Sequence, residues 1–185
     1  MRNTNSKKIK PNGFTLIELL VVISIIGVIS GVVLVSMQGV REKARDARRV
    51  SDMNAIIKAI HLYYDKTGQF PQAVNSCCQT GWAQGPCEDN NINFLPDLSS
   101  SGIMTYVPVD PVGKPPTYGP TECYGYQYAY FAPSYCGANW SRGGFFVLGV
   151  RDMETSSGAH PWSPGFIDCT GHNWQNNFEW VSGEY

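Results

Sequence analysis

The hydrophobic pattern begins with a long uncharged run that passes without a break into an amphipathic stretch. Residues 19–40 contain no charged side chain. At about 1.5 Å per residue, a helix of this length spans roughly 33 Å, enough to cross the core of a bilayer. Beyond it, apolar residues recur at intervals of three and four, which places them on one helix face: Val50, Met53, Ile57, Ile60 and Tyr64. We therefore expect one continuous helix of about 53 residues beginning at Phe14.

The end of this helix is predicted just before Pro71. No proline interrupts residues 14–70, and Thr67-Gly68 ahead of Pro71 is a typical helix stop. Within the helix, the segment 41–49 carries five positive and two negative side chains. We expect this segment to be a solvated helix face with ion pairs between successive turns, rather than a lipid-binding patch.

After Pro71 the helical periodicity stops and runs with strand character begin. Residues 124–131 alternate strictly and place four tyrosines on one face. Residues 144–151 form an apolar run typical of a buried strand, and the intervening residues suit a long hairpin loop. A further candidate strand lies near 178–181. The sequence therefore predicts an α+β protein in which a small antiparallel sheet packs on the apolar stripe of the helix.

The charge distribution separates the first residues from the rest of the chain. The net charge is -1, but residues 1–13 carry four basic and no acidic side chains, which leaves 10 basic and 15 acidic residues elsewhere. A mildly acidic chain argues against a nucleic-acid partner recognised by bulk electrostatics.

Glu18 is the only charged residue within residues 14–40. A carboxylate costs roughly 2.5–3.5 kcal/mol at the centre of a bilayer and less near its edge, so we expect Glu18 to have a function. The alternative is that Glu18 simply reaches toward the headgroups from the helix end. Gly27 and Gly31 form a G-x-x-x-G pair that would allow close helix packing, although glycine is also common in membrane helices without this role.

The segment Gly13-Phe14-Thr15-Leu16-Ile17-Glu18 joins a basic leader to the apolar run. It closely resembles the processing site of type IV prepilins and type II secretion pseudopilins. The resemblance covers residues 1 to about 71. It implies a pilin-like fold with a leader at 1–13, a transmembrane or filament-core helix at 14–40, its amphipathic continuation at 41–70 and a globular domain at 71–185.

The same resemblance implies a route from membrane to filament. A prepilin peptidase would cut after Gly13, and Phe14 would be N-methylated. Glu18 would pair with the amino group of Phe14 on a neighbouring copy of the chain, with Gly27 and Gly31 as further candidates for subunit packing. The protein would first be a single-pass protein of the inner membrane with its globular domain outside. It would then enter an extracellular or periplasmic filament built by a pilus or secretion assembly machinery.

Two other interpretations of the N-terminus remain open from the residues alone. A cleaved secretory signal has an apolar core of roughly 7–15 residues and a small-residue junction after it. No Ala-x-Ala junction follows the longer run in this chain. A plain N-terminal anchor would fit the length of the run but would need no Glu18.

The stretch 107–115 resembles the Asp-Pro-x-Gly-x-Pro loop of the major, G-type pseudopilins. Val112 replaces the usual aromatic residue, and a Pro-Pro pair follows. Such relatives often bind calcium in a loop of the globular domain, but no ligand set can be assigned here. The carboxylates of Asp110, Asp152, Glu154 and Asp168 are scattered in the sequence, and we expect them to be solvated surface acids without a metal or other cofactor.

All six cysteines lie in the globular part: Cys77, Cys78, Cys87, Cys123, Cys136 and Cys169. Because their number is even and this loop-rich part is expected outside the cytoplasm, we expect them to form disulfides. Six cysteines allow 15 pairings. Cys123 and Cys136 bracket the tyrosine-rich strand, and we take this pair as the first candidate. A metal site is disfavoured because no C-x-x-C occurs and the histidines are not at ligand spacing.

Catalysis has little support, because the chain lacks the common nucleophile, metalloprotease, nucleotide and dinucleotide motifs. His61 lies next to the apolar stripe, which favours a packing role. We therefore predict a structural filament subunit, not an enzyme. The alternative is a minor tip subunit whose aromatic residues bind a surface or a carbohydrate: Trp82, Trp140, Trp162, Trp174 and Trp180. A core role for these tryptophans competes with that alternative, and an anchored enzyme is a third and weaker hypothesis.

Overall fold

The computed structural model describes residues 13–73, 82–85, 94–112, 125–138 and 141–185, with side chains at all of these except 34–36 and 84–85. The chain divides into two compact units, Met1–Arg41 and Glu42–Tyr185. We refer to them as the N-terminal unit and the globular unit. Of the cysteines, Cys77, Cys78, Cys87 and Cys123 lie outside the described residues.

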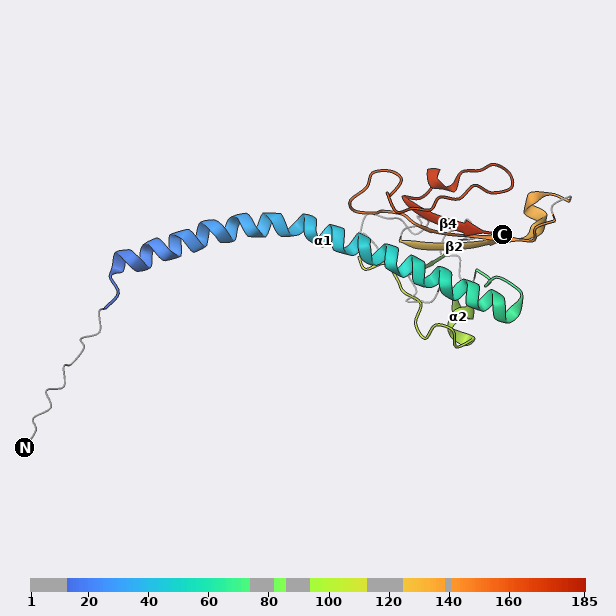
Figure 1. Ribbon diagram of the computed structural model, residues 1–185, viewed down its shortest axis with the longest axis horizontal. Coiled ribbons are helices and arrows are strands. Elements are labelled where there is room, and N and C mark those ends of the chain that lie inside the picture. The colour runs from blue at the N-terminus through green and yellow to red at the C-terminus, as the bar shows by residue number, and fades with distance from the viewer. Residues whose placement is uncertain (1–12, 74–81, 86–93, 113–124, 139–140) are drawn as a thin grey trace, which may run out of the picture. The chain divides into compact units, whose positions relative to one another are not determined.

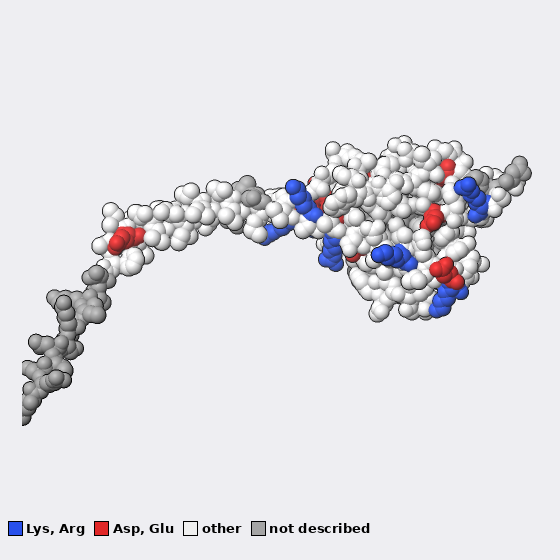
Figure 2. Space-filling model, viewed as in Figure 1, with Lys and Arg blue, Asp and Glu red and all other residues white. Residues whose placement is uncertain are grey.

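Helix α1 runs from Leu16 to Thr67 over 52 residues, which confirms the predicted long helix. It ends at Gly68, whose positive φ of 71° lets its N–H donate to the carbonyl of Tyr64 at 2.7 Å. In the N-terminal unit the apolar side chains of α1 are exposed, and this part is long and apolar enough to cross a membrane. Its surface is almost free of charge (Figure 2).

The globular unit contains a four-stranded antiparallel sheet in the order β1-β2-β3-β4. The strands are β1 (Ala83–Gly85), β2 (Tyr126–Phe131), β3 (Phe145–Val150) and β4 (Trp180–Glu184). A short helix, α2, covers Pro96–Ser100, and two 3-10 turns cover Pro133–Cys136 and Trp174–Asn176. Figure 1 shows the later part of α1 lying along one face of this sheet. The α+β, pilin-like class is thereby confirmed.

A first core lies between α1 and the sheet. Met53, Ile56 and Ile60 of α1 are fully buried. They belong to one cluster with residues of three strands that point to the same face: Tyr126, Tyr128, Phe146, Leu148, Val150 and Trp180. The predicted stripe is rotated slightly, because Ile56 rather than Ile57 is fully buried and Tyr64 is 44% exposed.

A second core covers the opposite face of the sheet. Phe145, Val147 and Val181 of the strands are buried there against Trp174 and Phe178. The latter two belong to the long connection between β3 and β4, residues 151–179, which we call the C-terminal excursion. Gly149 is required at this face, because a Cβ atom there would overlap the ring of Phe178.

The disulfide in the described chain joins Cys136 to Cys169, and it attaches the turn after β2 to the C-terminal excursion. The predicted pairing of Cys123 with Cys136 is therefore wrong. The error has a geometric reason: sequence proximity favoured a bridge across the tyrosine strand, whereas the excursion folds back over the sheet and brings Cys169 to Cys136. The two Cα atoms lie 5.6 Å apart, as a disulfide requires.

The tryptophans mostly fill the cores rather than forming an aromatic face. Trp174 and Trp180 are buried, and Trp82 packs on the second core. Trp162 is exposed, and Trp140 lies outside the described residues. Three of the four described tryptophans thus have the packing role that competed with the tip-subunit alternative.

Candidate processing and assembly site

The Gly13–Phe14 junction is exposed and lies ahead of the first turn of α1. Phe14 is 83% exposed. A peptidase needs an extended and accessible substrate, because a helical peptide bond is held by its own hydrogen bonds. The geometry of the junction therefore suits cleavage between these two residues.

Thr15 and Glu18 form a reciprocal cap at the start of α1. The hydroxyl of Thr15 accepts a hydrogen bond from the N–H of Glu18 at 3.3 Å, and the N–H of Thr15 donates to the Glu18 carboxylate at 2.8 Å. The Thr15 hydroxyl also donates to that carboxylate at 2.7 Å. This T-x-x-E arrangement is a capping box, which satisfies two N–H groups that would otherwise lack partners. The T-x-x-E spacing of Thr15 and Glu18 is a visible signal in the sequence, although it is not among the expectations stated above.

The Glu18 carboxylate lies beside an apolar hollow. Phe14, Ile17, Val21 and Val22 line this hollow with Glu18. Residues 14–40 contain no Lys, Arg or His. Any counter-charge for Glu18 must therefore come from another part of the chain, from another copy or from a new N-terminal amine.

Gly27 and Gly31 lie one turn apart on the exposed surface of the same helix. A Cβ atom built at either glycine would meet nothing within 4 Å in the described chain. Neither glycine is needed for packing against the described residues of this chain. Their candidate role in subunit packing stays a prediction.

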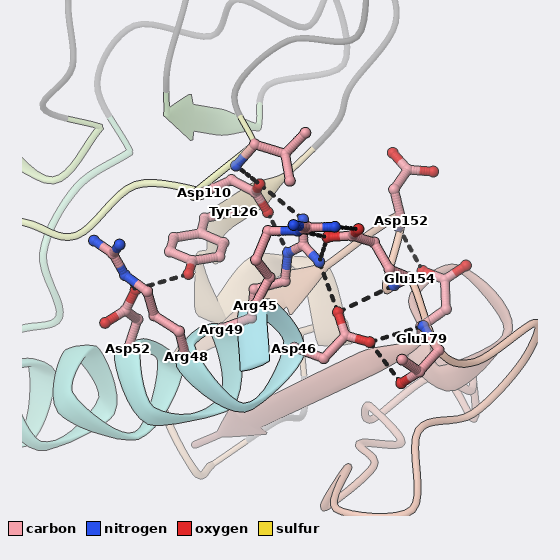
Figure 3. Close-up of polar contacts among 12 residues, drawn as sticks. Arg45, Asp46, Arg48, Arg49, Asp52, Asp110, Tyr126, Asp152, Glu154 and Glu179 are labelled. Atoms are coloured by element: carbon pink, nitrogen blue, oxygen red, sulfur yellow. Dashed lines mark hydrogen bonds and ion pairs between the residues drawn. The ribbon is translucent and has the colours of Figure 1, made fainter. Parts of the chain in front are cut away.

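A second cluster, made of charged residues, lies in the globular unit near the start of that unit's part of α1. Arg45, Asp46 and Arg49 of α1 meet Asp110 of the proline-rich loop and Glu154 of the C-terminal excursion (Figure 3). We call these five residues the ionic cluster. It joins three segments that are far apart in the sequence.

Arg49 is the centre of the ionic cluster. Its side chain is only 2% exposed, and its guanidinium binds Asp110 through two hydrogen bonds of 2.7 and 3.0 Å. It also donates to Asp46 at 2.6 Å and to Glu154 at 2.9 Å. Such fork geometry is the strong form of an arginine–carboxylate contact. Burial alone would lower the pKa of Arg49, but hydrogen bonds to Asp110 and Asp46 raise it above its ordinary value.

Asp110 also shapes its own loop. Its carboxylate accepts a hydrogen bond from the N–H of Val112 at 2.9 Å. This hydrogen bond forms an Asx turn, in which the side-chain carboxylate accepts in place of a backbone carbonyl. Asp110 of the Asp-Pro sequence thus has a physical role: it closes the loop and attaches it to α1 through Arg49.

Asp46 and Glu154 hold the start of the C-terminal excursion against α1. Asp46 accepts hydrogen bonds from the N–H groups of Glu154 and Thr155 at 3.0 and 2.8 Å, and from the Thr155 hydroxyl at 2.6 Å. Burial would raise the pKa of Asp46, but these donors and Arg49 lower it. Hydrogen bonds from Arg45 lower the pKa of Glu154 against the opposing effect of burial.

The burial of charged residues in the globular unit corrects two of our expectations. Segment 41–49 is not simply a solvated helix face, because Asp46 and Arg49 are buried. Asp110 and Asp168 are likewise buried, so they are not surface acids. A signal in the sequence could have found the cluster: Arg49 precedes Met53, Ile56 and Ile60 at helical spacing, which puts a charge within the apolar stripe and predicts a buried partner.

His61 is another correction, since it is not packed in the core. Its side chain is 47% exposed, and Nε2 lies 2.8 Å from a carboxylate oxygen of Glu184 on β4. It is thus a surface contact between α1 and the last strand.

The described carboxylates do not fit a calcium site. Calcium takes roughly six to eight oxygen ligands from a compact loop. The oxygens of Asp168 already accept from Thr170, His172 and the Trp174 indole, and those of Asp110 and Glu154 accept from arginines. No group of three or more His, Cys, Asp or Glu residues in the described part of the chain is arranged to hold a metal.

The fold and the N-terminal site together define a subunit of the prepilin class. Its long helix follows the exposed Gly13–Phe14 junction and precedes a small antiparallel sheet. The family described as the prokaryotic N-terminal methylation motif matches residues 10–34. No solved structure matches the chain significantly.

Three relatives are each described as type II secretion system core protein G. The protein of Escherichia coli is 40% identical over 112 residues, which cover 57% of this chain and 69% of the relative. That of Klebsiella pneumoniae is 29% identical over 105 residues, covering 57% and 71%. That of Aeromonas hydrophila is 35% identical over 65 residues, covering 35% and 46%, so this match spans less than half of the relative. The chain belongs to the type II secretion system core protein G family.

Proposed function

We propose that the chain is made as a prepilin, cleaved after Gly13, N-methylated at Phe14 and polymerised through α1 into the pseudopilus of a type II secretion system. The observation that carries this proposal is the Gly13–Glu18 segment, where an exposed junction precedes a helix with one carboxylate in an apolar surface. Membership of the core protein G family supports a main structural subunit over an enzyme.

The proposed location follows from the apolar helix. Residues 14–40 would lie in the inner membrane before assembly and in the filament core afterwards. The globular unit would stay on the outer side of that membrane. The proposed partners are a prepilin peptidase, the assembly machinery and further copies of this chain.

We give Glu18 two roles, and its carboxylate cannot fill both of them completely at the same time. In the free subunit its carboxylate caps α1, while in the filament it pairs with the N-terminal amine of Phe14 on a neighbour. Burying the carboxylate without a cation would cost several kcal/mol, so the pairing would favour subunits in the correct register. Residues Gly27 and Gly31 would allow helices to approach closely in the same core.

Three variants separate the charge of Glu18 from its capping role. Glutamine also serves in a capping box, so Glu18→Gln keeps the cap and removes the charge. Glu18→Ala removes both, and Thr15→Ala weakens the cap but keeps the charge. We expect all three to be cleaved in cells with a matching secretion system. Incorporation into cross-linkable filaments should fall at least about tenfold for both Glu18 variants, equivalent to about 1.4 kcal/mol per contact, and stay near wild type for Thr15→Ala.

The readout is the ratio of cross-linked multimer to processed monomer on immunoblots of membrane and sheared fractions. Wild-type incorporation of Glu18→Gln would show that capping, not charge, is what assembly requires. The proposed pairing would then be wrong.

A further inference from the structure

A groove crosses the globular unit at the C-terminal end of α1. It consists of two adjoining hollows of about 310 and 110 Å³ that share Tyr64, Phe70 and Tyr185. The larger volume lies at the lower end of the roughly 300–1,000 Å³ that is typical of ligand pockets. Figure 1 shows the end of α1 and the C-terminus at the same end of the unit.

Aromatic rings form the walls of the groove. Tyr64 and Phe70 lie with ring centroids 4.6 Å apart, and Phe70 lies 6.3 Å from Tyr130. Phe70 is 9% exposed and anchors this group to the first core, whereas Tyr64 is 44% exposed. The groove therefore presents aromatic rings whose phenol groups lie among polar side chains.

Glycine backbone shapes the side opposite α1. Gly143 and Gly144 line the larger hollow with Tyr130. A Cβ atom at Gly144 would collide with the Tyr130 ring and hydroxyl, and Gly143 has a positive φ of 89°. A side chain at Gly144 would displace Tyr130, and one at Gly143 would be strained by the positive φ.

Polar side chains surround the aromatic walls. Gln69, Gln72 and Arg142 line the larger hollow, and His61, Asp65 and Glu184 line the smaller one. The Arg142 guanidinium lies 6.0 Å from the centre of the Tyr185 ring. Positive and negative side chains both border the groove, and Glu184 is already paired with His61, so the groove as a whole has no strong net charge of one sign.

We propose that this groove binds one or two sugar rings of a neutral carbohydrate. A sugar ring presents an apolar C–H face that can lie against tyrosine, while its hydroxyl edges can both donate and accept hydrogen bonds. The planar amide of Gln69, which lines the larger hollow, can both donate to and accept from neighbouring hydroxyls. A compact hollow with two adjoining compartments suits rings better than an extended peptide.

The groove is independent of the residues proposed for filament formation. None of its lining residues belongs to the ionic cluster or to residues 13–31. Carbohydrate binding could therefore fail while filament assembly is intact, and the reverse also holds.

The test uses the full chain in lipid nanodiscs, because detergents with sugar headgroups would compete. Maltotriose, cellotriose and N,N′,N″-triacetylchitotriose are each titrated to about 10 mM by calorimetry. This concentration is about ten times a Kd of 1 mM. We expect saturable binding of at least one trisaccharide with a Kd below about 1 mM.

Tyr64→Ala should weaken that binding by about tenfold or more, because it removes an aromatic wall. Tyr135→Ala is the matched control: Tyr135 is 45% exposed and packs on Phe131 at 4.7 Å, but it does not line the groove. Its affinity should stay within about twofold of wild type. Gln69→Ala changes only an exposed side chain and should weaken binding by about threefold, which keeps the test valid if Tyr64→Ala is poorly folded.

Absence of saturable binding to all three sugars would overturn the proposal. Equal losses for Tyr64→Ala and Tyr135→Ala would also overturn it. If a proline-rich peptide bound in a Tyr64-dependent way while the sugars did not, the groove would be a peptide site and the carbohydrate assignment would be wrong.

Discussion

Arg49 occupies a core position of an amphipathic helix, and it does so because three carboxylates surround it. Asp46, Asp110 and Glu154 all bind its guanidinium. Removing one partner of a buried ion pair is far more costly than removing an exposed one, because the remaining charge stays desolvated. The stability of the globular unit should therefore depend strongly on this one side chain.

Arg49→Ala should lower the free energy of unfolding by about 3–5 kcal/mol, since it leaves Asp46 and Asp110 buried without their cation. Arg48→Ala is the control, because the Arg48 side chain is 65% exposed and its contact with Asp52 is 3.7 Å long. Its effect should be below about 1 kcal/mol. Tryptophan fluorescence in denaturant measures both, because all five tryptophans lie after Pro71. Equal losses for the two variants would contradict the role given to Arg49.

Acid should weaken the same cluster. The pKa values of Asp46 and Glu154 are lowered in the folded state from ordinary values of 3.8 and 4.5. A lowered folded pKa adds stability that is present above the unfolded pKa and is lost as the pH falls through the folded pKa. The free energy of unfolding should therefore fall progressively below about pH 4.5.

Asp46→Asn isolates the contribution of Asp46 to this acid effect. The variant should be less stable than wild type at pH 7, and the two curves should converge as the pH falls below about 3.8. Asp168 also has a lowered pKa and supplies a remaining slope in both proteins. Parallel curves over the whole acid range would show that Asp46 does not titrate as described.

The contacts of single residues were harder to predict than the helices and strands. The processing segment was legible because its residues are contiguous. Arg49, Asp110 and Glu154 come from three distant segments, so their contact depends on how the loop and the C-terminal excursion fold back. Only the Arg49 position within the apolar stripe pointed toward a buried pair.

Among the elements, the C-terminal excursion depends most on contacts that are distant in sequence. It has no strand of its own between β3 and β4, apart from an isolated bridge between Ile167 and Asn173. The Cys136–Cys169 disulfide and the donors around Asp168 hold it over the second core. Burial would raise the pKa of Asp168, but these donors lower it.

Replacing Cys136 and Cys169 together by serine should reduce stability by about 2–4 kcal/mol, because the bridge closes a loop of 33 residues in sequence separation. Denaturant unfolding of the double variant measures this loss. Peptide mapping without reductant gives a direct check of the pairing: a fragment containing Cys136 should be linked to one containing Cys169. A link from Cys136 to Cys123 would contradict the structure.

Elements with strong periodicity were predicted well, and short ones were not. α1, β2 and β3 lie within a few residues of their predicted bounds. β4 begins at Trp180, two residues later than expected, because Phe178 instead covers Gly149 in the second core. β1 and α2 have only three and five residues, too few for a repeating pattern, and tertiary contacts determine them.

At the scale of the whole molecule, the two units have opposite surfaces. The N-terminal unit exposes apolar side chains along a helix of membrane-spanning length, while the globular unit has two cores of buried apolar residues. Exposed apolar surface of that extent requires lipid or other subunits to cover it. A prepilin that moves from membrane to filament meets this requirement in both of its states.

The most direct test of this account is the intact mass and N-terminal sequence of the chain recovered from cells that contain a prepilin peptidase. The account predicts a chain that begins at Phe14 and carries one additional methyl group at its amino terminus. A chain that still begins at Met1 under these conditions would contradict it, because no free amine would then exist at Phe14 to pair with Glu18 of a neighbour.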